Sequence, residues 1–182
     1  MTQHHPRLYA AFFAALALCG AAPVQAADAC QTIEAASSKI WSLPVHLYST
    51  QTAAFRKNQP KTSESIYTGG ANGAIYVLVN GKWTRSRVTT GELKSAQDEA
   101  REKNKQTCHY ERDEPVNGEP AAVYSTHAEG EDFKTDITVW ISKTRNVPLR
   151  SESDMDVGGA MGKSHTSVRY EYTNVQPPPG VK

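Results

Sequence analysis

Residues 133–142 read FKTDITVWIS, and the pattern of these ten side chains indicates the class of fold. The side chains alternate between two sets. One set is Phe133, Thr135, Ile137, Val139 and Ile141, and the other is Lys134, Asp136, Thr138, Trp140 and Ser142. Because successive side chains of a strand point to opposite faces of a sheet, the alternation predicts a strand with one covered face and one face in water. Such strands are typical of antiparallel sheets.

The segments around this strand predict an antiparallel meander. Turn-forming clusters separate strand candidates at residues 108–112, 121–128, 133–142, 148–156 and 163–175. Upstream, Asn80-Gly81 joins Ala74–Val79 to Lys82–Val88, and Asn-Gly between two such runs is a strong hairpin signal.

A helix is expected before the first strands. Asp28 is its candidate N-cap, and Cys30, Ile33 and Trp41 fall near one face at helical spacing. Pro44 ends it, because proline cannot continue a helix.

A second helix is expected from Glu92 to about Lys105. Thr89-Thr90-Gly91-Glu92 resembles a capping box, and the apolar stripe that follows contains only Leu93, Ala96 and Ala100. Together the elements predict an α+β fold: one large, curved antiparallel sheet, an unclosed barrel, with two helices packed on or across it.

Residues 1–26 have the pattern of a secretory signal peptide. Arg7 precedes an apolar run from Leu8 to Leu18, and small residues around Ala26 form a cleavage site. The run is shorter than the ~20 residues of a membrane span, although a retained anchor is the alternative. We therefore expect a bacterial protein, periplasmic or secreted, with no membrane span after cleavage near Ala26. Residues 27–176 then form one domain, and the proline-rich residues 177–182 form a flexible tail.

Three cysteines are present, and cleavage would remove Cys19. The remaining pair, Cys30 and Cys108, is expected to form a disulfide in an oxidising compartment, with two free thiols as the alternative. The sequence has no Cys-x-x-Cys spacing, so a redox function is not expected.

Charge and motifs argue against several classes of function. The 20 Lys+Arg and 19 Asp+Glu give a net charge of +1, without the basic excess of nucleic-acid-binding proteins. The histidines are isolated from one another, so neither a metal site nor a cofactor is expected. No Gly-x-Ser-x-Gly motif occurs, and Ser125 beside His127 has no orienting acid that can be named. We expect a protein that is not an enzyme and has no catalytic residues.

Aromatic residues are the candidate ligand-binding residues. They occur on the first helix and on successive strands, where they could line the concave face of a curved sheet. The set is Trp41, Tyr76, Trp83, Tyr124, Trp140, Tyr170 and Tyr172. The alternative is that most of them pack in the core. Trp140 is the favoured member because it shares its face with polar neighbours.

Four short segments occur in a characteristic order along the chain. They are Ile75–Trp83 with Asn80-Gly81, Gly118–Tyr124, Val139–Lys143 followed by Val147–Arg150, and Arg169–Val175 before the prolines. In this order they resemble the LolA/LolB-like periplasmic lipoprotein-carrier superfamily. The resemblance implies an unclosed antiparallel barrel with helices across its mouth, and a site for acyl chains or apolar peptides. The helix after Thr90 departs from this pattern because it is mostly charged.

Two functions follow as expectations. The first is a non-enzymatic binding protein that takes a lipid, an amphiphile or an apolar segment of an envelope protein in the concave face of its sheet. The alternative is an envelope protein–protein interaction or inhibitor module with a solid core and no small-molecule site. An unrecognised hydrolase has the least support.

Overall fold

The computed structural model describes residues 24–57, 59–159 and 161–181. Helices α1 (Val24–Ser42) and α2 (Thr90–Lys103) accompany nine strands and one short 3-10 turn, η1 (Ala54–Arg56). The strands are β1 (Val45–Ala53), β2 (Lys61–Tyr67), β3 (Ile75–Val79), β4 (Lys82–Arg85), β5 (Lys105–Asp113), β6 (Ala121–Glu129), β7 (Lys134–Ser142), β8 (Pro148–Asp156) and β9 (Lys163–Glu171).

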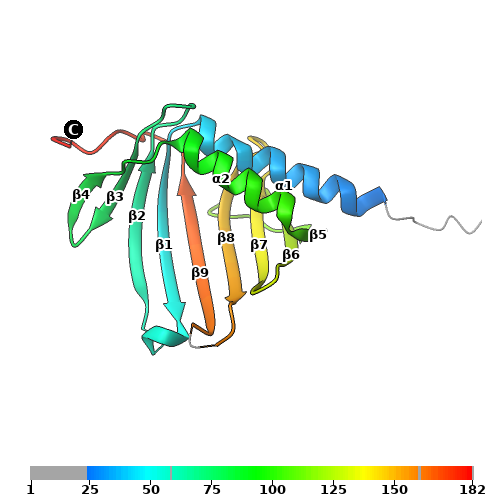
Figure 1. Ribbon diagram of the computed structural model, residues 1–182. Helices are drawn as coiled ribbons and strands as arrows, with labels where there is room; N and C mark the ends of the chain where they lie inside the picture. The colour runs from blue at the N-terminus through cyan, green and yellow to red at the C-terminus, as the bar shows by residue number, and fades with distance from the viewer. Residues whose placement is uncertain (1–23, 58, 160, 182) are drawn as a thin grey trace, which may run out of the picture.

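All nine strands form one antiparallel sheet in the order β4-β3-β2-β1-β9-β8-β7-β6-β5. The sheet consists of two meanders, β1–β4 and β5–β9, which meet where β1 pairs with β9. Among the described strands, β4 and β5 are edges and do not pair with each other, so the sheet is curved but not closed (Figure 1). The predicted α+β fold with an unclosed antiparallel sheet and two helices is confirmed.

The strand register confirms the alternation in residues 133–142. Val139 pairs with Tyr124 of β6, and Trp140 pairs with Val123, so the two sets face opposite sides of the sheet. The Asn80-Gly81 turn joins β3 to β4 as predicted, and both residues have positive φ, of 50° and 75°. That backbone conformation favours asparagine and glycine, and it suits the tight turn of a two-residue hairpin.

Helix α1 begins before the predicted N-cap. It starts at Val24, and Asp28 lies inside it, where its carbonyl accepts a hydrogen bond from Thr32 Oγ1 at 2.8 Å. The N-cap prediction is therefore wrong for this chain, because helical residues precede Asp28. The predicted signal peptide lies mostly outside the described residues, and its last residues belong to α1. In the predicted tail, Pro178 is buried.

Figure 1 shows α1 and α2 side by side across one end of the sheet, with the lower parts of β2, β1, β9 and β8 extending beyond them. A disulfide joins Cys30 of α1 to the fully buried Cys108 of β5, as predicted. Next to this bond, Ile33 and Ala36 of α1 pack against Val139 and Ile141 of β7. The disulfide and this cluster fix α1 on one face of the sheet, which we call the helix side.

The capping box of α2 is present as predicted, but the predicted apolar stripe is wrong for two of its three residues. Thr89 and Glu92 cap each other's backbone, whereas Ala96 and Ala100 are exposed. Leu93 is half-buried as predicted, and the other half-buried side chains of α2 are Lys94, Asp98 and Arg101. Arg101 pairs with Glu34 of α1 at 2.9 Å, so charged groups hold the two helices together. Two alanines offer too little apolar area to direct which face turns inward.

Candidate ligand-binding face

The helix side of the sheet carries a group of apolar and tyrosine side chains that remain half-buried. Paired residues of neighbouring strands lie on the same face of a sheet. Leu47 of β1 pairs with Tyr170 of β9 on one side and with Ser65 of β2 on the other. Ser65 in turn pairs with Val77 of β3, so these four residues form one row across four strands. Tyr67 and Val168 lie on the same face, two residues from this row. We call Leu47, Tyr67, Val77, Val168 and Tyr170 the apolar wall.

The tyrosines of the apolar wall are poorly hydrated although they keep accessible surface. Surrounding protein raises the pKa of Tyr67, and the neighbouring Tyr170 adds to the rise. Burial likewise raises the pKa of Tyr170, whose Oη lies 3.0 Å from Ser151 Oγ, a contact that acts in the opposite direction. Protein thus surrounds much of both tyrosine side chains, and all five residues of the wall keep part of their surface accessible.

The C-terminal end of α1 covers one end of this wall. The Trp41 ring stacks on Tyr67 with centroids 5.7 Å apart and an interplanar angle of 15°. The Trp41 carbonyl accepts a hydrogen bond from Gly70 N at 2.8 Å, and a Cβ added at Gly69 would lie 2.7 Å from Ser42 O. Gly69 has a φ of +76°, so both its backbone conformation and this close approach require glycine.

The same loop also holds the start of α2. Gly91 N donates to Ala71 O at 3.1 Å, and Thr90 N donates to Gly73 O at 3.0 Å, with Thr90 itself fully buried. Residues 69–73 thus link the end of α1 to the beginning of α2, and they set the position of both helices over the wall.

Beyond the helices the helix side is lined by hydroxyl groups. Ser49 Oγ and Ser63 Oγ lie 2.6 Å apart on β1 and β2. Ser153 of β8 and Thr166 of β9 follow in the next row, and both are half-buried. Toward the free end of the strands, the helix side therefore carries these hydroxyl groups together with the apolar side chains of Ile137 and Met155.

The seven predicted ligand-binding aromatics divide between the two faces. Trp41, Tyr124 and Tyr170 lie on the helix side, where Tyr124 packs against the α1 cluster. Tyr76, Trp83 and Trp140 lie on the opposite face. Tyr172 follows β9, packs against the cluster that contains Trp140 and donates to Pro148 O at 2.9 Å. The structure does not gather these residues into one site, and their role in binding stays a prediction.

Trp140 belongs to a packed cluster on the opposite face. Only 5% of it is exposed, between Val123 and Leu149, and the Arg150 guanidinium lies 4.7 Å from its ring centroid. Its indole Nε1 is buried without a hydrogen-bond partner. Its polar neighbours along β7 predict a solvent-exposed face, but side chains from neighbouring strands pack against Trp140 and exclude water from it.

Aromatic and charged side chains also contact each other farther along that face. His46 Nε2 lies 3.1 Å from Glu64 Oε2, and His46 Nδ1 lies 3.0 Å from Tyr48 Oη. Trp83 approaches the His46 ring edge-on at 5.9 Å, and the Arg169 guanidinium lies 4.0 Å from the Tyr48 centroid. Burial and the nearby Glu171 raise the pKa of Tyr48, so its phenol stays protonated. The polar groups of His46, Tyr48 and Glu64 thus contact one another, and none of them is arranged as an activated nucleophile.

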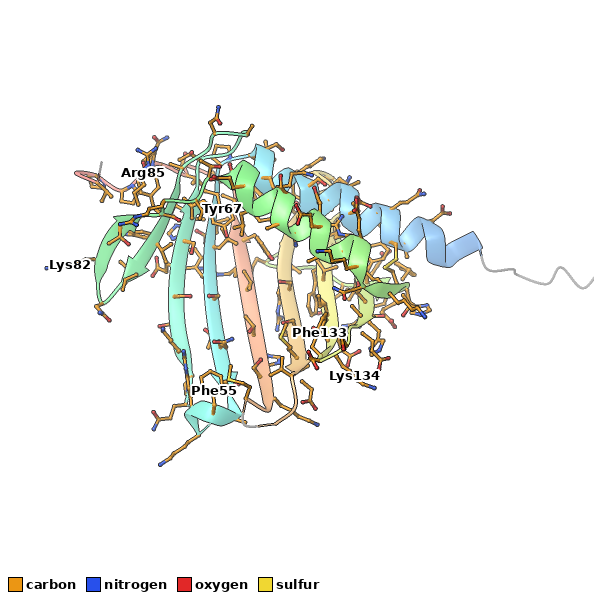
Figure 2. All side chains as sticks on the ribbon, in the orientation of Figure 1. Phe55, Tyr67, Lys82, Arg85, Phe133 and Lys134 are labelled. Carbon is orange, nitrogen blue, oxygen red and sulfur yellow. A yellow bond between two sulfur atoms is a disulfide. The ribbon has the colours of Figure 1, made fainter. Side chains whose placement is uncertain are left out.

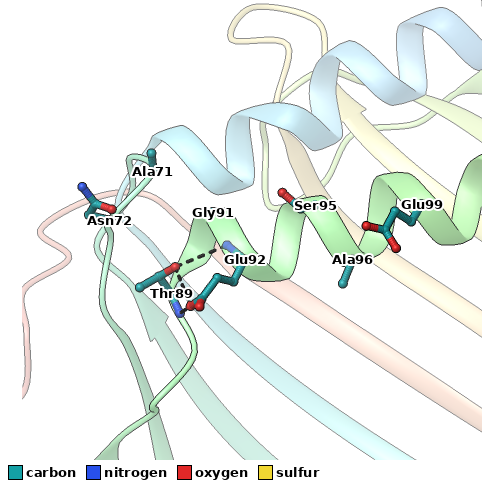
Figure 3. Close-up of a pocket in the computed structure, with 8 residues that line it drawn as sticks. All are labelled: Ala71, Asn72, Thr89, Gly91, Glu92, Ser95, Ala96 and Glu99. Carbon is teal, nitrogen blue, oxygen red and sulfur yellow. Dashed lines mark hydrogen bonds between the residues drawn. The ribbon is translucent and has the colours of Figure 1, made fainter.

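An open cleft of about 630 Å³ lies at the N-terminus of α2 (Figure 3). It is lined by Ala71, Asn72, Thr89, Gly91, Glu92, Ser95, Ala96 and Glu99. Glu92 accepts from Thr89 N at 2.7 Å, and hydrogen bonds from Thr89 lower the pKa of Glu92. Because this carboxylate already satisfies the helix N-terminus, the cleft offers no anion site.

Within the described part of the chain, no three His, Cys, Asp or Glu side chains are placed to hold a metal ion. His127 and His165 each pair with an aspartate, Asp136 at 2.7 Å and Asp154 at 2.9 Å. The Ser125 hydroxyl donates to Glu111 rather than to His127. These pairs lie on the opposite face of the sheet and do not form a nucleophile–base arrangement.

No protein-family model and no curated protein matches the sequence. The chain is similar to the crystal structure of LprF from Mycobacterium bovis, with 8% identity over 87% of this chain and 99% of that chain, at a TM-score of 0.45. It is also similar to a LolA superfamily protein from Nitrosomonas europaea, with 9% identity over 86% of this chain and 96% of that chain, at a TM-score of 0.31. The likeness is one of fold.

Proposed function

We propose that this protein is a non-enzymatic binding protein that holds a lipid or another amphiphile on the helix side of its sheet. One observation carries the proposal: the apolar wall keeps accessible surface beside two helices, although its tyrosines are poorly hydrated. Apolar area that is left in partial contact with water gains free energy when a ligand covers it. An apolar segment of an envelope protein would gain in the same way.

The two zones of the helix side give the ligand an orientation. Its apolar part would lie on the wall between Leu47 and Val168, and its polar group would lie on the hydroxyl-lined surface that includes Ser49 and Ser153. Each buried methylene contributes ~0.8 kcal/mol, so a chain of about eight carbons would contribute roughly 6 kcal/mol before the cost of ordering it. A single-chain amphiphile fits this division better than a wholly apolar ligand.

We further propose that the protein acts outside the cytoplasm, in the periplasm or after secretion. The Cys30–Cys108 disulfide supports this location, because such bonds persist in oxidising compartments. The signal peptide predicted for residues 1–26 would direct the export. No helix among the described residues is long and apolar enough to cross a membrane.

The experiment compares Val168→Glu with Ser167→Glu, using a fluorescent single-chain fatty acid as the probe. Val168 belongs to the wall, whereas Ser167 is next to it on the opposite face of the same strand and is also half-buried. A carboxylate on the wall would have to lose water against the acyl chain, at a cost of at least about 2 kcal/mol, or roughly 30-fold in affinity. Ser167→Glu should bind like the wild type.

Equal affinities for the two variants would contradict the proposed site. Mass spectrometry of protein purified without detergent supplies a second readout, in which the wild type carries amphiphile and Val168→Glu does not. The interaction module is the second candidate, favoured by the exposed Arg150 and Arg169 and the half-buried Tyr48 on the opposite face. An empty wild type that binds no probe would favour that candidate.

A further inference from the structure

Exposed apolar side chains gather at the end of the sheet that lies away from the helices. They are Phe55 in η1, with 47% of its surface exposed, Met155 with 40%, Val157 with 36% and Met161 with 55%. These four residues, which we call the apolar tip, are half of the eight exposed large hydrophobic residues in the described ranges. Figure 2 labels Phe55 at this end.

The apolar tip combines the η1 turn, which carries Phe55, with the end of β8, which carries Met155, and the connection that follows, which carries Val157 and Met161. The η1 turn continues β1, and residues 157–159 and 161–162 lie between β8 and β9. Strands β1 and β9 remain paired as far as Ala53 and Ser164. A Cβ added at Gly162 would lie 3.2 Å from the Ala54 Cβ, so the turns are in contact. Side chains from positions about 100 residues apart thus form one projecting surface.

Basic residues lie beside the η1 part of the apolar tip, whereas Asp154 and Asp156 flank Met155 on β8. Residues 54–61 contain Arg56, Lys57 and Lys61 and no acidic residue. The Arg56 guanidinium lies 5.1 Å from the Phe55 centroid, which places a positive charge directly beside an exposed aromatic ring. At the start of β9, the Lys163 side chain is 83% exposed, and its Nζ lies 4.0 Å from Asp156 Oδ2, at the outer limit for an ion pair.

We propose that the apolar tip docks on the surface of an anionic lipid bilayer, with Phe55 and Met161 entering the interfacial layer. Apolar side chains beside lysine and arginine are the combination that binds such surfaces, because the cations pair with lipid headgroups while the apolar groups leave water. A protein partner would need about 800 Å² on each side, and four partly exposed side chains offer roughly half of that.

The tip lies at the free end of the helix side, beyond the hydroxyl-lined surface. Met155 itself faces the helix side, since it pairs with Thr135 and Ser164. Docking here would place the open end of the proposed binding face against the bilayer. Docking through these four residues does not require a ligand on the helix side.

The experiment is flotation with vesicles of phosphatidylglycerol and phosphatidylcholine in equal parts, and with pure phosphatidylcholine vesicles. We expect the wild type to float with the anionic vesicles at low salt and to be released at high salt. Phe55→Ser/Met161→Ser should lower the partition constant at least about tenfold. Arg56→Glu/Lys57→Glu should abolish the preference for anionic vesicles.

Val88→Ser is the matched control. Val88 is 44% exposed, but it lies next to the start of α2 at the helix end of the molecule, so this variant should float like the wild type. A wild type that stays unbound, or an equal loss in Val88→Ser, would overturn the proposal. It would also fail if light scattering showed a wild-type dimer that the double variant loses, since the tip would then be a protein interface.

Val168→Glu separates the two proposals. It should lose the fatty-acid probe and still float with anionic vesicles. Loss of flotation in the tip variants with probe binding intact would support the docking surface alone.

Discussion

Removal of the Cys30–Cys108 bond should destabilise the folded protein more than any other single change outside its core. The bond closes a loop with a sequence separation of 78 residues. On the chain-entropy relation, opening such a loop gives the unfolded chain freedom worth ~4.5 kcal/mol at 25 °C. For a domain of about 150 residues, that corresponds to a fall in Tm of roughly 9 to 18 °C.

The assay is urea unfolding of the Cys30→Ala/Cys108→Ala variant against the wild type, followed by circular dichroism. Because the bond restricts the unfolded chain, its removal should also raise the dependence of the unfolding free energy on urea. Spectra of the two folded proteins should agree, since Ile33 and Ala36 still pack α1 on the sheet. A loss below about 1 kcal/mol with an unchanged urea dependence would refute the reasoning.

Two further perturbations test the loop and the wall. Gly91→Ala should cost roughly 3 kcal/mol in urea unfolding, because its Cβ would lie 2.3 Å from Ala71 O. Gly70→Ala, with a φ of +83° but open space around it, should cost only about 1 kcal/mol, and equal losses would contradict the close-contact explanation. Tyr67 and Tyr170 have raised pKa values, so they keep their protons in the folded state above pH ~10, where unfolded phenols ionise. Their contribution to stability is complete below that pH and declines above it. A phenolate absorbance titration at about pH 11 should therefore show fewer ionised tyrosines in folded than in urea-unfolded protein, and equal values would contradict the burial of these two side chains.

Local sequence patterns predict the architecture because each strand and turn of an antiparallel meander depends mainly on residues close together in the sequence. Alternation identified β7, Asn80-Gly81 identified the β3–β4 hairpin, and Thr89 with Glu92 identified the start of α2. The inward face of α2 is predicted wrongly at Ala96 and Ala100, because alanine side chains are too small to determine which face turns inward. Arg101 reaches Glu34 of α1, a contact between positions that no local pattern connects.

The candidate site was predictable only in part because face assignment depends on register. The spacing of aromatic residues does not tell which side of a curved sheet each one meets, so Trp83 and Trp140 were grouped with Tyr170 although they lie on the opposite face. Within the last strand the alternation did place Val168 and Tyr170 together. Tyr67 was missed, and its signal was the apolar end of β2 next to the Gly69-Gly70 turn.

The seam between β1 and β9 joins parts of the chain that are far apart in sequence, since Leu47 pairs with Tyr170. Each meander can form its own hairpins early, but the sheet becomes continuous only when the last strand arrives. If the chain is exported N-terminus first, as proposed, β1 crosses the membrane early and has no β9 to pair with until most of the chain has followed. Cys108 emerges long before β9, so the covalent link to α1 is available earlier than the strand that completes the sheet. The order of synthesis thereby favours oxidation first and closure of the seam last.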